Sequence, residues 1–175
     1  RLAGHLIVRG CDHSKVSIVP PPIRVSDFPE CTPEEGLPPV LYAGNLDAYQ
    51  NLGLLFSAME LVRKRLPDAR LQIATGESVS YPDAEVVPIR GFDSLHRLLA
   101  QDSVFALPRV SWSGYPIKLL NAMAAGKAMV ACRSAAYPLT HEVDGLVVPD
   151  DNVRAFADAL YTLLTDRRLR QRLGQ

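Results

Sequence analysis

Hydrophobic residues recur along this chain in short runs, and a regular alternation of such runs with longer mixed stretches begins near residue 39. The runs are rich in β-branched residues and too short for helices, which favours buried strands of a parallel sheet. They predict strands at 40–42, 71–74, 85–89, 103–107, 128–131 and 145–148. Between them, apolar residues recur at intervals of three and four, as is typical of amphipathic helices. The pattern therefore predicts a Rossmann-like α/β fold, a parallel sheet with helices on both faces.

The predicted helices fill the gaps between these strands. Three of them span 51–65, 93–101 and 115–125, and Gly126 ends the third. A last helix starts after Asp150 or Asp151 as its N-cap and continues toward Leu169. We expect the late arginines of this region, including Arg170, to form a solvated helix end.

The first part of the chain lacks this alternation. Consecutive prolines follow Val19, and residues 30–39 are rich in Pro and Glu. We therefore expect a linker at 1–38, followed by one Rossmann-like lobe at 39–175. Because the sequence starts at Arg1 rather than at a methionine, we also expect it to be part of a larger protein.

Composition narrows the classes of partner. The 19 basic residues are matched by 19 acidic ones, so we expect no nucleic-acid partner and no broad attraction to anionic membranes. No apolar run reaches the ~18 residues that a membrane span needs, which leaves any membrane association to the rest of the parent protein. Cys11, Cys31 and Cys132 form an odd set without metal-ligand spacing, so we predict a reducing, cytoplasmic location.

Ligands of parallel α/β sheets bind where the strands end at their carboxyl side. The loop after the fourth strand leads into the helix at 115–125, and the free N–H groups at such a helix start suit a diphosphate. Lys118 and Asn121 are three residues apart, so one helix face offers a cation and an amide. From these residues alone, an ordinary crossover helix with an incidental exposed lysine explains the pattern equally well.

Four segments, in order, resemble motifs of the C-terminal, donor-binding lobe of GT-B glycosyltransferases of family 4 (group 1). They are SKVSIVPPP at 14–22, LYAGNL at 41–46, YPIKLLNAMAAGKAMV at 115–130 and DGLVVP at 144–149. They resemble the family's interdomain crossover, its first strand with a glycine loop, its Glu-Gly-Phe-Gly turn with the following helix, and its Asn-Gly-Leu-Leu-Val-Pro turn. Four motifs in sequence are far more specific than a single glycine loop.

The resemblance implies a retaining, hexosyltransferase-like enzyme that takes a sugar from a nucleoside diphosphate sugar without a metal or other cofactor. The acceptor would be bound mainly by an N-terminal lobe that this chain does not contain, so the chain alone should be inactive. The positions that the resemblance marks as catalytic are Ser113 and Asn121, and we add Lys118, on the same helix face as Asn121, as a third catalytic candidate. Donor-binding positions would be Gly44, Asn45, Gln50, Arg90, Gly91, Phe92, Gly114, Tyr115, Pro116 and Ile117.

This sequence departs from the family pattern at charged positions. The family's two glutamates fall on Ser113 and Asn121, and the Arg and Lys of its first loop correspond to Asn45 and Gln50. Each lost charge-assisted hydrogen bond is worth about 1.5 to 3 kcal/mol, so another cation must replace them, and Lys118 is the preferred candidate. Two arginines at predicted strand ends come next: Arg90 and Arg109.

The missing charges support a second hypothesis, in which the chain is a non-catalytic glycosyltransferase-like domain that acts as a binding or partner module. An epimerase of the GT-B kind is less compatible, because no strand-end His or carboxylate is placed for proton abstraction. A dinucleotide-binding domain is disfavoured because no Gly-x-Gly-x-x-Gly follows any predicted strand.

Overall fold

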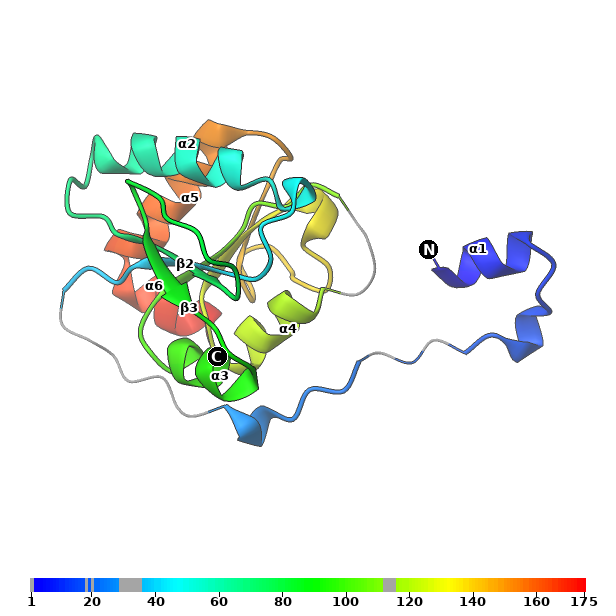
Figure 1. Cartoon of the computed structure of the whole chain (residues 1–175). Helices are drawn as coiled ribbons and strands as arrows, with labels where there is room; N and C mark the ends of the chain where they lie inside the picture. Colours follow the sequence, from blue (N-terminus) through cyan, green and yellow to red (C-terminus); the bar gives the residue numbers. More distant parts are fainter. Residues whose placement is uncertain (1, 18, 20, 29–35, 112–115) are drawn as a thin grey trace.

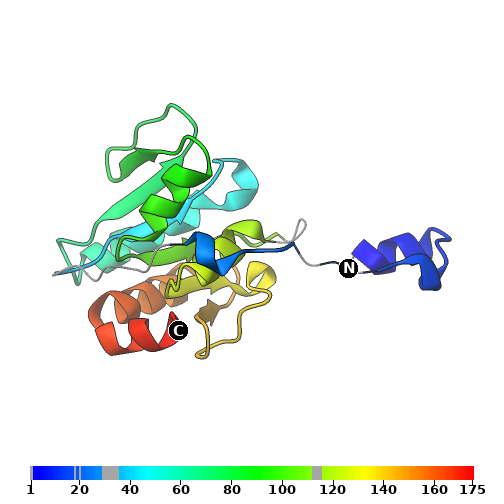
Figure 2. The same ribbon diagram turned by 90° about the horizontal axis from the view of Figure 1, so that it is seen from below.

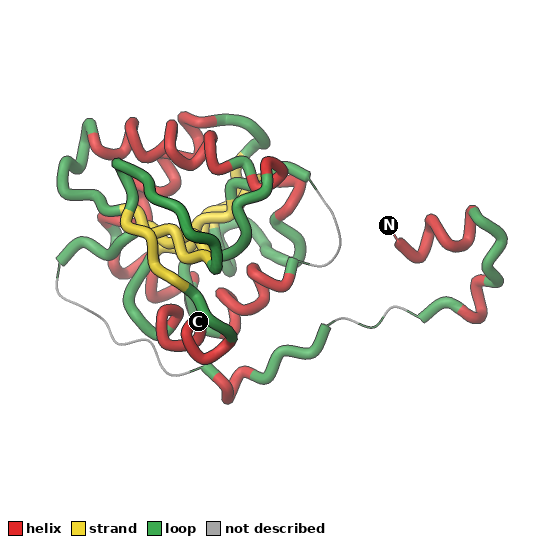
Figure 3. The backbone as a smooth tube through the Cα atoms, in the orientation of Figure 1, coloured by secondary structure: helices red, strands yellow, loops and turns green. Residues whose placement is uncertain are grey.

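The structure, a computed structural model, describes residues 2–17, 19, 21–28, 36–111 and 116–175. Its centre is a six-stranded parallel sheet in the order β3-β2-β1-β4-β5-β6, with helices on both sides (Figure 1, Figure 3). The strands are β1 Val40–Ala43, β2 Leu71–Thr75, β3 Glu85–Pro88, β4 Val104–Leu107, β5 Met129–Cys132 and β6 Leu146–Val148. Each overlaps one predicted strand, and the predicted Rossmann-like fold is confirmed.

The α-helices are α1 Leu2–Val8, α2 Leu52–Arg63, α3 Phe92–Leu99, α4 Ile117–Ala124, α5 Val153–Thr165 and α6 Arg167–Leu173. Short 3₁₀ helices occur at His13–Lys15, Val25–Asp27, Ala48–Gln50 and Arg133–Ala135. The sequence does not predict α1, because a short segment gives too small a window for a helical period. In two perpendicular views α1 lies apart from the sheet (Figure 1, Figure 2). Among the described residues, no helix has the length and apolar character needed to cross a bilayer.

The sheet separates two hydrophobic cores. Alternate residues of β1 point to opposite faces, as the pleat of a strand requires. Val40 and Tyr42 pack in the core formed with α2 and α5, whereas Leu41 and Ala43 pack in the core formed with α3 and α4. All four are buried, which explains why this central strand is apolar without polar alternation.

The C-terminal region forms two helices rather than the single predicted one. Asn152, and not Asp150 or Asp151, caps α5, because its side chain accepts a hydrogen bond from the N–H of Ala155. Asp166 then caps α6 by accepting from a backbone N–H in the first turn of that helix. A capping aspartate after a helical run is a start signal for a new helix.

Arg170 is 9% exposed, so its predicted place at a solvated helix end is wrong. Its Nη1 donates to the carbonyl oxygens of Leu163 (2.8 Å) and Leu164 (3.0 Å). These carbonyls lie in the last turn of α5, where no further helical N–H can reach them. Arg170 therefore satisfies the end of one helix from the next, and Asp102 lies 3.8 Å from its Nη2.

Candidate functional site

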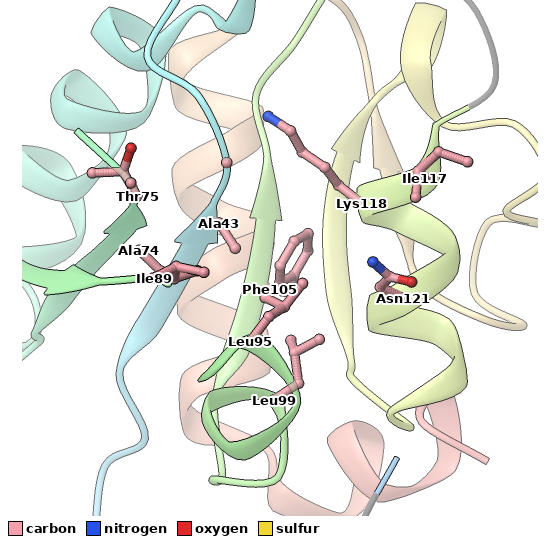
Figure 4. A pocket seen from close by; sticks show the side chains of 12 residues that line it. Ala43, Ala74, Thr75, Ile89, Leu95, Leu99, Phe105, Ile117, Lys118 and Asn121 are labelled. Atoms are coloured by element: carbon pink, nitrogen blue, oxygen red, sulfur yellow. The ribbon is translucent and has the colours of Figure 1, made fainter. Parts of the chain in front are cut away.

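A cavity of about 190 Å³ opens at the carboxyl ends of the central strands (Figure 4). It lies at the edge where the sequence predicts a ligand site, with α3 on one side and α4 on the other. Its lining residues are Ala43, Gly44, Ala74, Thr75, Gly76, Ile89, Leu95, Leu99, Phe105, Ile117, Lys118 and Asn121. Most of these side chains are apolar and a few are polar, which is the usual character of a small-molecule site.

Asn121 contributes an unpaired amide to this cavity. The residue is 7% exposed, and its side chain makes no hydrogen bond within the described part of the chain. In Figure 4 its amide points from α4 toward the strand ends. An amide offers two donors and an acceptor, all of them available to a molecule that enters the cavity. A ligand that carries hydroxyl groups would satisfy it.

Lys118 extends from the same face of α4 to the end of β1. Its Nζ donates to Tyr42 Oη (2.9 Å) and, over a longer distance, to Asn45 Oδ1 (3.4 Å). The side chain passes directly over Gly44, where a Cβ would overlap Lys118 Nζ and Cε. Gly44 also has a φ of +145°, a conformation that other residues rarely adopt. A glycine at this position therefore makes room for the ammonium group.

The surroundings of Lys118 alter its protonation. The pKa of Lys118 is lowered from 10.5 to about 8, mainly by burial and additionally by the nearby guanidinium of Arg109, while the carboxylate of Asp47 opposes the shift. The group is still mostly protonated at neutral pH. Burial raises the pKa of Tyr42 well above its usual range, so its hydroxyl stays neutral and able to donate.

The loop after β1 is held by a network of uncharged amides rather than by cations. Asn45 Nδ2 donates to Tyr49 Oη (3.1 Å) and to Asp47 Oδ2, and Asn45 Oδ1 accepts from Gln50 Nε2 (2.6 Å). Gln50 is 1% exposed and lies outside the cavity lining, and its Oε1 has no hydrogen-bond partner among the described residues. Asn45 thus lies at the edge of the site, and the buried Gln50 holds the Asn45 side chain through a hydrogen bond.

The other predicted site residues differ in how near they come to the cavity. Ile117 lines it, and Pro116 is the N-cap residue of α4. Residues 90–92 are exposed and do not line it, although Ile89, directly before them, does. The predicted positions Ser113, Gly114 and Tyr115 lie outside the described residues.

Arg109, which follows β4, adds a second positive charge beside that of Lys118. Its guanidinium lies over the ring of Tyr49, 5.1 Å from the centroid, and its Nε donates to the carbonyl of Ser111. Arg109 therefore contacts the loop after β1 through Tyr49 and the loop after β4 through Ser111. It adds positive potential at Lys118 without lining the cavity.

Sequence reasoning missed Tyr42 and the apolar floor of the cavity. Tyr42 is the one residue with a polar group in the buried strand β1, and a buried tyrosine hydroxyl usually has a partner; this was the available signal. No group of three or more His, Cys, Asp or Glu residues within the described ranges could hold a metal ion. The predicted independence of a metal stays a prediction.

Two curated proteins match parts of this chain. A trehalose phosphorylase of Grifola frondosa is 34% identical over 106 residues, which are 58% of this chain and 14% of that protein. An exopolysaccharide phosphotransferase of Streptomyces coelicolor is 34% identical over 79 residues, or 43% of this chain and 8% of that protein. The matched segments thus span a small part of these relatives.

Solved structures share the fold. HepE of Anabaena, in complex with UDP and glucose, aligns with a TM-score of 0.81 at 12% identity over 99% of this chain and 54% of its own. Sucrose-phosphate synthase of Thermosynechococcus elongatus aligns at 0.69 and 20% identity, over 87% of this chain and 44% of its own. The C-terminal domain of a group 1 glycosyl transferase (LpcC) of Francisella tularensis aligns at 0.67 and 16% identity, over 86% and 84%.

The family profile "Glycosyl transferases group 1" matches residues 38–166, which include all six strands and the cavity. This confirms the resemblance to group 1 enzymes and to the C-terminal lobe of the GT-B fold, while the narrower assignment to family 4 stays a prediction. With well over half of its length covered by that profile, this chain belongs to the group 1 glycosyl transferase family.

Proposed function

We propose that this chain is the donor-binding lobe of a retaining glycosyltransferase, which holds a nucleoside diphosphate sugar while the sugar passes to an acceptor. One observation carries the proposal. A single face of α4 presents an ammonium group, Lys118, and an unpaired amide, Asn121, to the same apolar cavity at the strand ends. This combination fits the three parts of a nucleotide, which are an apolar base, a diol and a diphosphate.

The parts of the ligand would be distributed along the cavity as follows. The base occupies the apolar space against α3, the ribose hydroxyls pair with the Asn121 amide, and the diphosphate lies by Lys118 and Gly44. The α4 N-terminus adds the positive end of a helix dipole to the same region. Support also comes from HepE, which shares this fold over 99% of the chain and binds UDP and glucose.

The chemical task of such a lobe is to stabilise the leaving group. Negative charge grows on the diphosphate oxygen as the bond to the sugar breaks, and a fixed ammonium group favours that transition state over the ground state. Lys118 would perform this task without a metal ion. The acceptor and any base that activates it would belong to another lobe of a cytoplasmic parent enzyme, so the chain alone would bind the donor but turn over little.

A ligand-binding measurement tests the proposal. The melting temperature of the 175-residue chain is followed with UDP, GDP and ADP and with their sugars, because a ligand at 100 times its dissociation constant stabilises by about 2.7 kcal/mol. We expect a concentration-dependent rise with at least one of these nucleotides and a smaller one with the matching nucleoside. Absence of any shift at millimolar concentration overturns the donor-binding role.

A non-catalytic binding module remains the second candidate, and the loop after β1 is the observation that favours it. Asn45 is occupied by hydrogen bonds within the loop, and the carboxylate of Asp47 beside it repels a diphosphate. In that case the chain folds normally and no nucleotide changes its melting temperature. Activity of the full-length parent would then be indifferent to Lys118→Met.

A further inference from the structure

Two side chains from opposite faces of the sheet meet at the end of β1. Tyr42 belongs to the core under α2 and α5, whereas Lys118 comes from α4, which covers the other face. Their polar ends are 2.9 Å apart, and the ammonium lies 4.9 Å from the centroid of the tyrosine ring. Gly44 follows β1 directly, and only a residue without a Cβ lets the lysine cross there.

The hydroxyl of Tyr42 has a fixed direction. It donates its proton to the carbonyl oxygen of Asn45 at 2.6 Å. A phenol has one donor and lone pairs to accept with, so the lone pairs remain for the Lys118 ammonium. The ring itself is 0% exposed and cannot swing away. Tyr42 is therefore a rigid acceptor that also holds the loop carrying Gly44 and Asn45.

We propose that Tyr42 is a positioning residue for the donor site: its hydroxyl holds the Lys118 ammonium over Gly44, at the place where the donor diphosphate binds. This rests on the proposed function for the position of the diphosphate. Tyr42 does not line the cavity, so its effect on the donor would pass through Lys118 and through the loop that its hydroxyl holds.

Lys118 needs such an anchor because its side chain is long and its charge is partly desolvated. A lysine has a flexible four-carbon stem, and its ammonium is strongly hydrated, so the free group would turn toward water. Around it, Asp47 attracts the charge and Arg109 repels it. Its other hydrogen-bond acceptor among the described residues, Asn45 Oδ1, is at 3.4 Å. The Tyr42 hydroxyl is the closer and better fixed of the two.

The first experiment compares Tyr42→Phe with Tyr49→Phe, each in the 175-residue chain. Both changes remove one hydroxyl from the same region, but Tyr49 contacts Asn45 and is 41% exposed. Lysine labelled with ¹³C at Cε is followed by NMR across pH 6 to 11, and Lys118→Arg assigns its signal among those of Lys15, Lys64 and Lys127. We expect the pKa of Lys118 to rise from about 8 toward 10.5 in Tyr42→Phe, and to stay unchanged in Tyr49→Phe.

Other results of this titration contradict the proposal. An unchanged pKa of Lys118 in a folded Tyr42→Phe variant means that the ammonium holds its place without the hydroxyl. A further fall means that Tyr42 stabilises the charge in place but does not position it. If Tyr42→Phe does not fold, the unmodified chain decides: a nuclear Overhauser effect between the Lys118 Cε protons and the Tyr42 ring is expected, and its absence overturns the proposal.

The second experiment measures nucleotide affinity in the same variants. In Tyr42→Phe we expect the affinity for UDP, or for the nucleotide that binds best, to fall at least about fivefold, the effect of one hydrogen bond. Affinity for the matching nucleoside should not change, and Tyr49→Phe should affect neither ligand. Equal losses for nucleotide and nucleoside indicate a general structural role and refute positioning. If the unmodified chain binds no nucleotide, the proposed function fails, while the NMR titration still tests the contact.

Discussion

The Lys118 ammonium is the charge on which donor binding should depend most. Replacing Lys118 with Met keeps an unbranched apolar stem of similar length and removes only the charge. In the loop after β1 the nearby polar groups of Asn45 and Gln50 are neutral amides, so they cannot compensate. One charge-assisted hydrogen bond is worth about 1.5 to 3 kcal/mol, and 1.4 kcal/mol corresponds to a factor of ten. We therefore expect Lys118→Met to weaken UDP binding about 10- to 100-fold.

Comparison of UDP with uridine isolates this effect. Both ligands are titrated calorimetrically into the unmodified chain and into Lys118→Met at pH 7 and low salt. Uridine affinity should stay within about twofold, because the apolar cavity and Asn121 remain. Equal weakening of both ligands would show that Lys118 only packs against the nucleoside, and unchanged UDP binding would refute its role at the phosphate.

Four other measurements follow from the same site. UDP affinity should be constant from about pH 7, where the terminal phosphate is ionised, to about pH 8 and fall above it, since Lys118 loses its proton with a pKa of about 8, whereas Lys118→Met should lack this step. Because the pKa of Lys118 in the folded chain lies below 10.5, the charged ammonium opposes folding at pH 7 and ceases to do so above pH 10.5. The melting temperature of Lys118→Met should therefore be higher than that of the unmodified chain at pH 7, and the difference should be smaller at pH 10. Gly44→Ala should weaken UDP binding about tenfold or more, because the new methyl group displaces Lys118. It should also lower the unfolding free energy by about 1 to 3 kcal/mol, because the φ of residue 44 is +145°. Retained UDP affinity in a calorimetric titration would contradict this prediction. Asn121→Ala should weaken uridine and UDP by the same factor, about 5- to 10-fold, since a ribose contact is common to both; a loss confined to UDP argues against the ribose contact.

The fold could be predicted because its signals are local. Each strand is a short, mostly apolar run, and the helices α2, α3 and α4 that connect β1 to β2, β3 to β4 and β4 to β5 each show a helical period. The pairing of Lys118 with Asn121 followed from helical spacing, and both line one cavity. The break between α5 and α6 was missed although Asp166 is a capping residue, because the arginines after it continue a helical composition.

What could not be predicted depends on contacts between distant parts of the chain. Tyr42 and Lys118 are 76 positions apart, and nothing local to either residue indicates the other. Arg170 looks like a solvated charge in sequence, but the fold of α6 against α5 buries it on two carbonyl oxygens. In each case the polar partner is fixed only after the tertiary structure forms, so residue type and spacing carry no information about it.

The position of Lys118 would explain how a site whose loop after β1 contains no cation could bind the proposed anionic donor. A charge on a flexible loop would be hydrated and would have to reorganise when the donor binds. Lys118 is instead partly desolvated and held over Gly44 before any ligand arrives. The proposed interaction with a phosphate should therefore be stronger than that of a surface lysine, because less water must be removed and the local dielectric constant is lower. The same desolvation opposes folding, so stability and donor affinity should change in opposite directions when the charge is removed.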